Sequence, residues 1–321
     1  MYPRLLGDVG GTNARFGWQS REGAALARIH VLPCADYADI ALAIEAYLAC
    51  AGVSAPAAAC IGIANPVTGD HVSMTNHHWS FSICALQQRL SLQKLKVIND
   101  FTALAMSIPD IPTAHLIQIC GGKAEPNASI ALIGAGTGLG VSGLIPTVDK
   151  CNWLPIAGEG GHSTLAVQTL IEFQVIEIIR RRYGHVSAER VLSGQGLTDL
   201  YSALCELKSL PLQVPLSPAA ISNLALMEQE TLALEALDLF AGFLGSVAGN
   251  LALTFGARGG VYLGGGIVPH WLGWFEQSSF KSRFIAKGRF ENYLKKIPVW
   301  VINAPHSPAL WGAARLLSTL G

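Results

Sequence analysis

Two glycine-rich segments are the strongest candidates for binding phosphate. The first is Gly7-Asp-Val-Gly-Gly-Thr12 and the second is Gly134-Ala-Gly-Thr-Gly-Leu-Gly140, and each follows a short apolar run. Glycine tolerates positive φ and lets backbone N–H groups approach a ligand without an intervening side chain, and phosphate is the usual ligand of such turns. Asp8 stands at the mouth of the first turn, where a carboxylate can hold a hydrated Mg²⁺. A tight hairpin with an Asx-type hydrogen bond is the alternative.

Three polar clusters supply carboxylates and a histidine, which can accept protons or bind hydroxyl groups. Asn99-Asp100 follows the apolar run Leu95-Lys-Val-Ile98, and aspartate is a poor strand residue. This pair either serves a binding site or caps the helix that starts at Phe101. The other two clusters lie beside glycine and an expected helix start, where the helix dipole alone favours glutamate. They are Glu159-Gly-Gly-His162 and Ser187-Ala-Glu189.

Two common nucleotide-binding motifs are not supported by their surroundings. Gly138-Leu-Gly-Val-Ser-Gly143 matches the dinucleotide pattern G-x-G-x-x-G, which requires a helix to open inside the motif. Pro146 and Pro155 leave too little chain for that helix, so we expect a hairpin. Gly122-Lys123 is followed by Ala124 in place of Ser or Thr, so the Walker pattern fails as well.

The elements that must hold these groups alternate between strands and helices, which is typical of an α/β fold. The strand at Ser129–Ile133 with its glycine turn repeats the opening design, and Gly259–Ile267 is a weaker third copy. The repetition resembles a duplication. Further expected elements are a strand at Ala58–Ala64 and helices at Ile40–Ala51, Phe101–Ser107, Val167–Ile179 continuing to Arg180–Arg182 before Gly184, Thr231–Ala252 and Pro308–Leu320.

The composition describes an ordered protein that is large enough for two lobes. The chain has 321 residues, of which 50% are hydrophobic and 14% are charged, so disorder is excluded. Lys plus Arg and Asp plus Glu both number 22, which gives a formal net charge of +0. A nucleic-acid partner is therefore not expected, because such proteins carry a basic footprint.

Cysteine usage and the apolar segments predict a cytoplasmic protein without a membrane span. The seven cysteines include no Cys-x-x-Cys pair, so reduced thiols are expected in place of zinc or disulfide exchange. Arg4 and Asp8 leave no room for the apolar region of a signal peptide. The segment 239–257 carries no charge and is long enough to span a membrane. Its four glycines and its polar Ser246, Asn250 and Thr254 favour a buried core helix.

Taken in order, these motifs resemble those of the bacterial glucokinases, within the superfamily of sugar kinases, heat-shock chaperones and actin. The resemblance runs from Leu6 to about Gly312 and departs from the family pattern at Gln195 and Asn65. The chain lacks the Cys-x-Cys-Gly zinc motif and the helix-turn-helix of the related repressor and kinase group. The longest matching stretches are Gly7–Arg15, Met74–His77 with Trp79, Ile98–Thr102, Gly134–Val141, Gly158–His162 and Gly184–Gly194.

The resemblance implies an α/β fold of two lobes, built from duplicated ribonuclease-H-like (actin-like ATPase) domains with ATP in an interlobe cleft. A small domain would comprise residues 1–110 and 301–321, and a large domain residues 111–300. The implied reaction transfers the γ-phosphoryl of ATP to the 6-hydroxyl of glucose, the entry step of glycolysis. The resemblance also implies Mg²⁺, no zinc, a cytoplasmic homodimer, and neither a nucleic-acid nor a membrane partner.

Site residues carry over from the family position by position. Asp100 is the expected catalytic base, and Asp8 is expected to hold Mg²⁺ through water. The expected glucose ligands are Asn99, Asp100, Glu159, His162 and Glu189. The expected ATP-binding residues are Asp8, Gly10, Gly11, Thr12, Asn13, Gly136, Thr137, Gly138, Gly264, Gly265 and Gly266.

Three other functions compete with this one. A sugar-responsive regulator with the same fold would be expected to lose Asp8 or Asp100, and this chain keeps both. An actin-like or chaperone-like ATPase would have no use for the polar set around Glu159 and Glu189. A kinase for mannose, fructose or an N-acetyl sugar stays open, because the sequence does not separate these hexoses.

Overall fold

A computed structural model describes residues 1–75, 77–211 and 215–319 of the chain. The matching stretch Met74–His77 and the expected helix to Leu320 each include a residue outside this description. The chain forms two compact units. Unit 1 comprises Met1–Pro112, Thr147–Ala157 and Ala304–Gly321, and unit 2 comprises Thr113–Pro146 and Gly158–Asn303.

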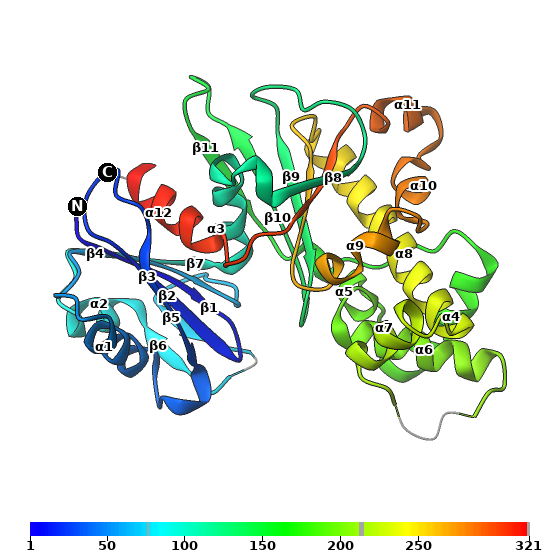
Figure 1. Cartoon of the computed structure of the whole chain (residues 1–321), viewed down its shortest axis with the longest axis horizontal. Coiled ribbons are helices and arrows are strands. Elements are labelled where there is room, and N and C mark those ends of the chain that lie inside the picture. The colour runs from blue at the N-terminus through cyan, green and yellow to red at the C-terminus, as the bar shows by residue number, and fades with distance from the viewer. Residues whose placement is uncertain (76, 212–214, 320–321) are drawn as a thin grey trace. The chain divides into compact units, whose positions relative to one another are not determined.

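Unit 1 is built on a five-stranded sheet with the order β3-β2-β1-β4-β7 (Figure 1). β1 pairs antiparallel with β2 and parallel with β4, and β4 pairs parallel with β7. β4 is buried along its whole length, as expected for a central strand with parallel neighbours. The strands are β1 (Arg4–Val9), β2 (Asn13–Gln19), β3 (Ala27–Pro33), β4 (Ala58–Ile63), β7 (Lys94–Asn99), the small pair β5 (His71–Ser73) and β6 (Ser80–Ser82), and β11 (Trp153–Ala157).

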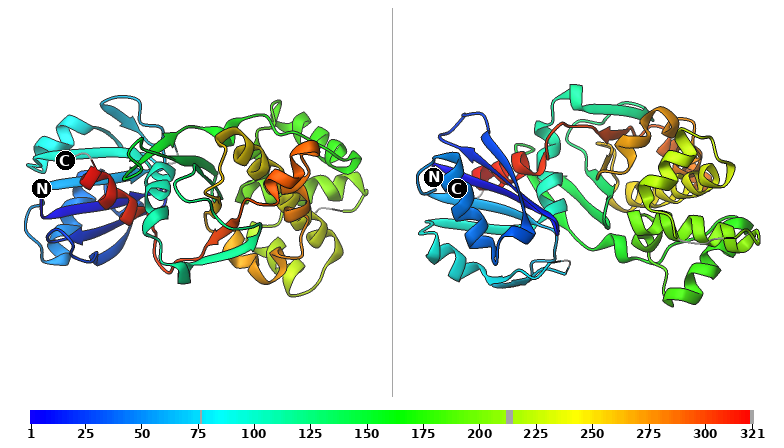
Figure 2. Two further views of the ribbon diagram at one scale, coloured as in Figure 1. Left: turned by 90° about the horizontal axis from the view of Figure 1, so that it is seen from above. Right: turned by 60° about the horizontal axis from the view of Figure 1, so that its bottom comes forward.

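Local signals in the sequence set the limits of the unit 1 helices. Asp39 caps the first turn of α1 by accepting a hydrogen bond from the Leu42 N–H, and Gly52 ends the helix with φ 59°. α12 packs so closely on α3 that a side chain at Gly312 would overlap the Ala103 carbonyl oxygen. The C-terminal helix thus lies beside the sheet of unit 1 (Figure 2). The helices are α1 (Ile40–Ala51), α2 (Ile83–Arg89), α3 (Asp100–Ser107) and α12 (Ala309–Thr319).

The sheet of unit 2 repeats the core of the first sheet. The order of its strands includes the run β10-β9-β12-β13-β8, in which β9 pairs antiparallel with β10 and parallel with β12. These are the relations that β1 has to β2 and β4, so the structure repeats the design as the glycine turns predicted. The strands are β8 (Leu116–Cys120), β9 (Ile130–Ala135), β10 (Leu139–Pro146), β12 (Val261–Gly264) and β13 (Val299–Ile302).

Most helices belong to unit 2, and α8 is the longest of those described. Thr169 and Glu172 form a capping box at the start of α4, and its three arginines pair with Glu177 and Glu206 on the surface. Among the described residues, one helix, α8, is long and apolar enough to cross a membrane. Of its apolar 18-residue stretch, 72% is buried inside the structure. The helices are α4 (Leu170–Tyr183), α5 (Ala188–Val191), α6 (Gly194–Leu207), α7 (Pro218–Leu226), α8 (Thr231–Phe255), α9 (Leu272–Phe275), α10 (Phe280–Ile285) and α11 (Glu291–Leu294).

Several expected limits differ from the structure, and two of these differences have a clear physical reason. The predicted division placed the whole range 111–300 in one domain, whereas Thr147–Ala157 belongs to unit 1, where β11 contacts α3. The expected helix starting at Val167 begins at Leu170 instead, because Thr169 is its N-cap. Val167 fits the apolar spacing of the helix, although it lies before the first helical residue.

Candidate active site

The first glycine-rich turn joins β1 to β2. The Gly10 N–H donates to the Asn13 carbonyl at 2.9 Å and closes the turn, and the Cys34 N–H donates to the Thr12 carbonyl at 2.9 Å. The turn is therefore fixed by its own backbone and by the segment that follows β3. Gly11 and Thr12 lie at its tip, where backbone amides and a hydroxyl are available to a ligand.

Asp8 lies in β1, directly before this turn. Its carboxylate is 13% exposed and its Oδ2 lies 3.6 Å from Nη1 of Arg15, the residue opposite it on β2. Ser307 also forms a hydrogen bond with it. Burial raises the pKa of Asp8 above its usual range, and the Ser307 hydrogen bond and the Arg15 charge offset part of that rise.

Asn99 and Asp100 occupy the junction between β7 and α3. The Asn99 side chain caps α3 by accepting from the N–H groups of Phe101 and Thr102 at 2.9 and 3.1 Å. The capping role that the sequence left open for this pair therefore falls to Asn99. Asp100 is half-buried, and its Oδ1 accepts from the Asn99 amide at 3.0 Å and from the Phe101 N–H at 2.9 Å. These bonds fix the orientation of the Asp100 carboxylate.

The strand register brings the two acidic groups of unit 1 to one edge of the sheet. Asp8 pairs with Gly62 in β4, and the next residue of β4, Ile63, pairs with Asn99 in β7. In the strand order, β4 alone lies between β1 and β7. Adjacent strands lie about 4.8 Å apart. A side chain at Gly62 would contact Cα of Asp100 at 3.4 Å. The carboxyl ends of parallel strands are the usual place for ligand sites in α/β sheets.

The predicted ATP-binding residues of unit 2 also meet at one sheet edge. The turn at Gly136–Gly138 joins β9 to β10, so the hairpin expected here is confirmed. Gly134 of β9 pairs with Gly264 of β12, and Gly265 follows with φ 78°. A side chain at Gly265 would overlap the Ala135 carbonyl oxygen. Only glycine fits this approach, which holds the two glycine segments side by side.

The remaining predicted sugar ligands form a second cluster in unit 2. Glu159 directly precedes a short 3₁₀ turn that packs on β10, and His162 is the last residue of that turn. Both side chains are exposed. Glu189 is the second residue of α5, and its Oε1 lies 3.8 Å from Nδ1 of His162. An isolated bridge between Thr164 and Ser187 joins the two segments. The structure thus brings together residues that stand far apart in the sequence.

Comparisons with known proteins identify the family. The glucokinase family model matches residues 5–320. The chain is 49% identical over 319 residues to a glucokinase from Aromatoleum aromaticum, with 98% of this chain and 95% of that protein covered. It is 46% identical over 316 residues to the bifunctional protein glk of Paraburkholderia xenovorans, covering 98% of this chain and spanning 49% of that protein's length. A glucokinase structure from an Antarctic psychrotroph is 34% identical, with a TM-score of 0.88 and 99% of each chain covered.

The chain belongs to the glucokinase family. The predicted fold, the two-lobed actin-like ATPase fold, is confirmed. So is the predicted class of enzyme, an ATP-dependent hexose kinase acting on glucose.

Side chains of the types that commonly bind metals are scattered over the part of the chain that the structure describes. Among the described residues, no three His, Cys, Asp or Glu side chains gather in a group that could hold an ion. The seven cysteines are all free, in keeping with the expected reduced thiols.

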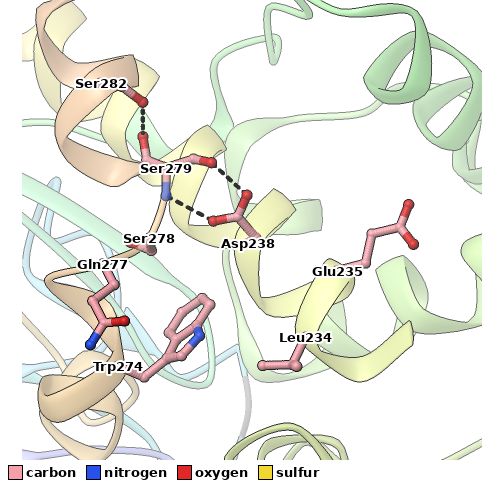
Figure 3. A pocket seen from close by; sticks show the side chains of 8 residues that line it. All are labelled: Leu234, Glu235, Asp238, Trp274, Gln277, Ser278, Ser279 and Ser282. Carbon is pink, nitrogen blue, oxygen red and sulfur yellow. Dashed lines mark hydrogen bonds between the residues drawn. The ribbon is translucent and has the colours of Figure 1, made fainter. Parts of the chain in front are cut away.

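One cavity of unit 2 lies away from the predicted site residues. It has a volume of about 620 Å³ and lies where α8 meets α9 and α10 (Figure 3). Its Asp238 accepts from the N–H and the hydroxyl of Ser279, and its Glu235 pairs with Lys208. These carboxylates are engaged in holding helices together, and none of the predicted glucokinase ligands lines the cavity.

Sequence reasoning missed three partners of the predicted residues. Arg15 was recoverable, because the hairpin register places it opposite Asp8. Ser307 had no signal, since it reaches Asp8 only through the return of the C-terminal segment. The third partner is the Leu139 N–H, which donates to Oε2 of Glu189 at 2.9 Å. It is a backbone group, so the type of residue at position 139 gives no sign of it.

Proposed function

We propose that this chain transfers the γ-phosphoryl of ATP to the 6-hydroxyl of glucose, with Asp100 as the base. One observation carries the assignment of roles. The carboxylates of Asp8 and Asp100 come from β1 and from the start of α3, directly after β7, at the same edge of the unit 1 sheet, with only β4 between the two strands. One acid is thereby available for the phosphate side of the reaction and the other for the attacking hydroxyl.

Asp100 receives the proton of the sugar hydroxyl. As the 6-oxygen bonds to the γ-phosphorus, the bond between that phosphorus and the bridging oxygen breaks and ADP leaves. The hydroxyl proton moves to the Asp100 carboxylate. In a loose phosphoryl-transfer transition state, positioning and charge stabilisation outweigh early proton removal. The two donors on Oδ1 of Asp100 serve that positioning, because they hold the carboxylate still.

The sugar is proposed to bind through the amide, carboxylate and imidazole groups that the family resemblance named. Carboxylates accept hydrogen bonds from hydroxyls, and a site built to pair a hydroxyl rejects an analogue that lacks it by up to roughly 10⁴- to 10⁵-fold. The side-chain Oδ1 of Asn99 already accepts hydrogen bonds from two backbone N–H groups. This residue would therefore both shape the site and bind the sugar. The proposed ligands are Asn99, Asp100, Glu159, His162 and Glu189.

ATP is proposed to bind at the two glycine turns, with Mg²⁺ held through water by Asp8. Mg²⁺ commonly uses one or two protein carboxylates and completes its shell with water and phosphate oxygens, so a single, largely buried carboxylate fits it. When bound, the ion would neutralise charge on the β- and γ-phosphates. The backbone N–H groups of Gly10–Asn13 and Gly136–Gly138 supply donors to the phosphates, and Gly264–Gly266 would lie near the adenosine.

The remaining family properties are proposed for this chain as a whole. Units 1 and 2 would act as the small and large domains, with Thr147–Ala157 added to the small one. The protein would work in the cytoplasm as a homodimer. Glucose phosphorylation would be the entry step of glycolysis.

A coupled assay of ADP release with a panel of hexoses, with and without Mg²⁺, tests the proposal. We expect rapid Mg²⁺-dependent release with glucose and far slower release when no sugar is present. Equal release with and without sugar would indicate an ATPase that acts on a protein partner. Faster release with mannose, fructose or an N-acetyl sugar would reassign the substrate, and release unaffected by chelation would remove the role proposed for Asp8.

A further inference from the structure

Glu189 uses its two carboxylate oxygens in different directions. Its Oε1 lies 3.8 Å from Nδ1 of His162. Its Oε2 accepts a hydrogen bond from the Leu139 N–H at 2.9 Å. Leu139 is buried and directly follows the Gly136–Gly138 turn. One partially exposed side chain therefore connects the proposed sugar ligands of unit 2 with the turn proposed to bind phosphate.

The turn is shaped around this carboxylate. The Gly136 N–H donates to the Gly138 carbonyl at 2.9 Å and closes the loop. A Cβ at Gly138 would lie 2.5 Å from Oε2 of Glu189, so the absence of a side chain there makes room for the carboxylate. The Gly136 carbonyl accepts from the Gly194 N–H at 2.9 Å. Both external supports of the turn thus come from the short segment 189–194.

The Glu189 bond is the stronger of these two supports on chemical grounds. A hydrogen bond from a backbone N–H to a carboxylate is roughly twice as strong as one between neutral groups. The segment that carries Glu189 is itself held in place, because Ser187 caps α5 and the Ala188 N–H donates to the Ser163 carbonyl at 2.9 Å. Glu189 is therefore placed to impose one conformation on the turn.

We propose that Glu189 is a positioning residue for the nucleotide as well as a sugar ligand. It holds the Gly136–Gly138 turn ready for phosphate through the Leu139 N–H, before any sugar binds. Sugar hydroxyls that bind to Glu189 and His162 would then fix the carboxylate further, which raises nucleotide affinity. Linkage requires the nucleotide to raise sugar affinity by the same factor. The sugar half of this inference rests on the proposed function, and the nucleotide half does not.

Binding of a nonhydrolysable ATP analogue, AMP-PNP with Mg²⁺, is to be measured by calorimetry in the absence of sugar. A mere sugar ligand would not affect this measurement. We expect Glu189→Ala to weaken analogue binding by roughly tenfold, the size expected for a lost hydrogen bond to a charged group. Glu189→Gln keeps an acceptor for the Leu139 N–H and should restore most of the affinity.

Gly138→Ala is a second, independent probe of the same contact. It keeps the Glu189 residue, but its methyl group would push the Glu189 carboxylate off the Leu139 N–H. We expect weaker analogue binding here too. Glu177→Ala is the matched control, because Glu177 pairs with Arg180 on the surface of α4, and it should bind the analogue like the unaltered protein.

The outcomes separate this inference from the proposed function. Unchanged sugar-free affinity in folded Glu189→Ala or Gly138→Ala, with only the KM for glucose raised, would overturn the positioning role. If Glu189→Ala does not fold, the Gly138→Ala and Glu189→Gln pair gives the answer. A protein that phosphorylates no hexose, yet loses analogue affinity in these variants, would defeat the proposed function and leave the nucleotide role of Glu189 standing.

Discussion

The two glycine turns occupy matching places in matching sheets, yet they obtain their negative charge in different ways. In unit 1 the residue before the last residue of the strand is Asp8, and its carboxylate is buried beside the turn. In unit 2 the matching position is Gly134, whose missing side chain lets β12 approach closely. The carboxylate next to the second turn comes instead from Glu189, on a separate helix.

This contrast shows what the repeated design provides and what it leaves to local sequence. In each unit, a β-hairpin with a parallel strand beside it provides a turn with exposed backbone amides. This does not depend on the side chains near the turn. Charge is then added once within the strand, where we propose that it serves a cation, and once from outside, where we propose that it holds the turn. We therefore expect the acids of unit 1 to affect turnover most and the neutral side chains of the second turn to affect it least.

Asp100→Asn should have the largest effect, because the amide keeps the shape of the side chain but cannot accept the hydroxyl proton. We expect kcat to fall by roughly 10²- to 10⁴-fold, measured by coupled ADP release at saturating glucose and ATP. Asp110→Asn is the matched control, since Asp110 pairs with Arg315 on the surface of unit 1. Near-normal turnover in a folded Asp100→Asn protein would refute the role of base.

Asp8→Asn should have the second-largest effect on activity. It also allows the contributions of the two glycine turns to be compared directly. Loss of one preorganised charge at the phosphates is expected to lower kcat/KM for MgATP by roughly 10²-fold. The counterpart in unit 2 is Thr137→Val, which removes an exposed hydroxyl and should cost less than about tenfold. If Thr137→Val proved the more damaging change, the assignment of charge to the first turn would be wrong.

Close helix contacts allow a comparison of the packing in each unit. A methyl group at Gly312 would overlap the Ala103 carbonyl oxygen in unit 1, and one at Gly245 would overlap the Phe280 carbonyl oxygen in unit 2. Each Gly→Ala change should lower the free energy of unfolding by about 1–3 kcal/mol. Gly242, also in α8, has its nearest neighbours at 3.6 Å, so Gly242→Ala should raise stability by up to about 1 kcal/mol. Urea unfolding of the three variants measures this, and equal destabilisation by all three would contradict it.

Asp70→Asn should have the smallest effect, which depends on pH. The side chains of Ser82 and Cys84, with the Cys84 N–H, hold the pKa of Asp70 at about 2. Because the pKa is lower in the folded protein, the ionised form stabilises the fold above about pH 3.9, the unfolded value. That contribution disappears as the pH falls through about 2. The urea midpoints of variant and parent should differ slightly at pH 6 and converge by pH 2, and a constant difference would exclude this cause.

The sequence predicted those features of the fold that depend on local pattern. The limits of α1 agree with the helical pattern expected around Ile40–Ala51, and the structure shows Asp39 and Gly52 capping its two ends. The hairpin at β9 and β10 was predicted from the prolines that exclude a helix. The assignment of Thr147–Ala157 to unit 1 was not predicted, since packing of β11 on α3 depends on contacts distant in sequence.

The candidate site was predictable as a set of residues but not as a geometry. Residue types and the family resemblance named Asp8, Asp100 and Glu189. The bond between Glu189 and the Leu139 N–H could not be foreseen, because the donor is a backbone group and the two residues are 50 positions apart. The Ser307 contact with Asp8 was hidden for the same reason, since it arises only once the C-terminal segment has folded back.

The most direct test of the central claim is the identity of the product. The protein would be incubated with ATP, Mg²⁺ and glucose, and the products followed by ³¹P NMR, with 6-deoxyglucose in a parallel sample. We predict one glucose 6-phosphate for each ADP, and neither sugar phosphate nor rapid ADP release from 6-deoxyglucose. ADP without a sugar phosphate, or a phosphate on another hydroxyl, would contradict the account.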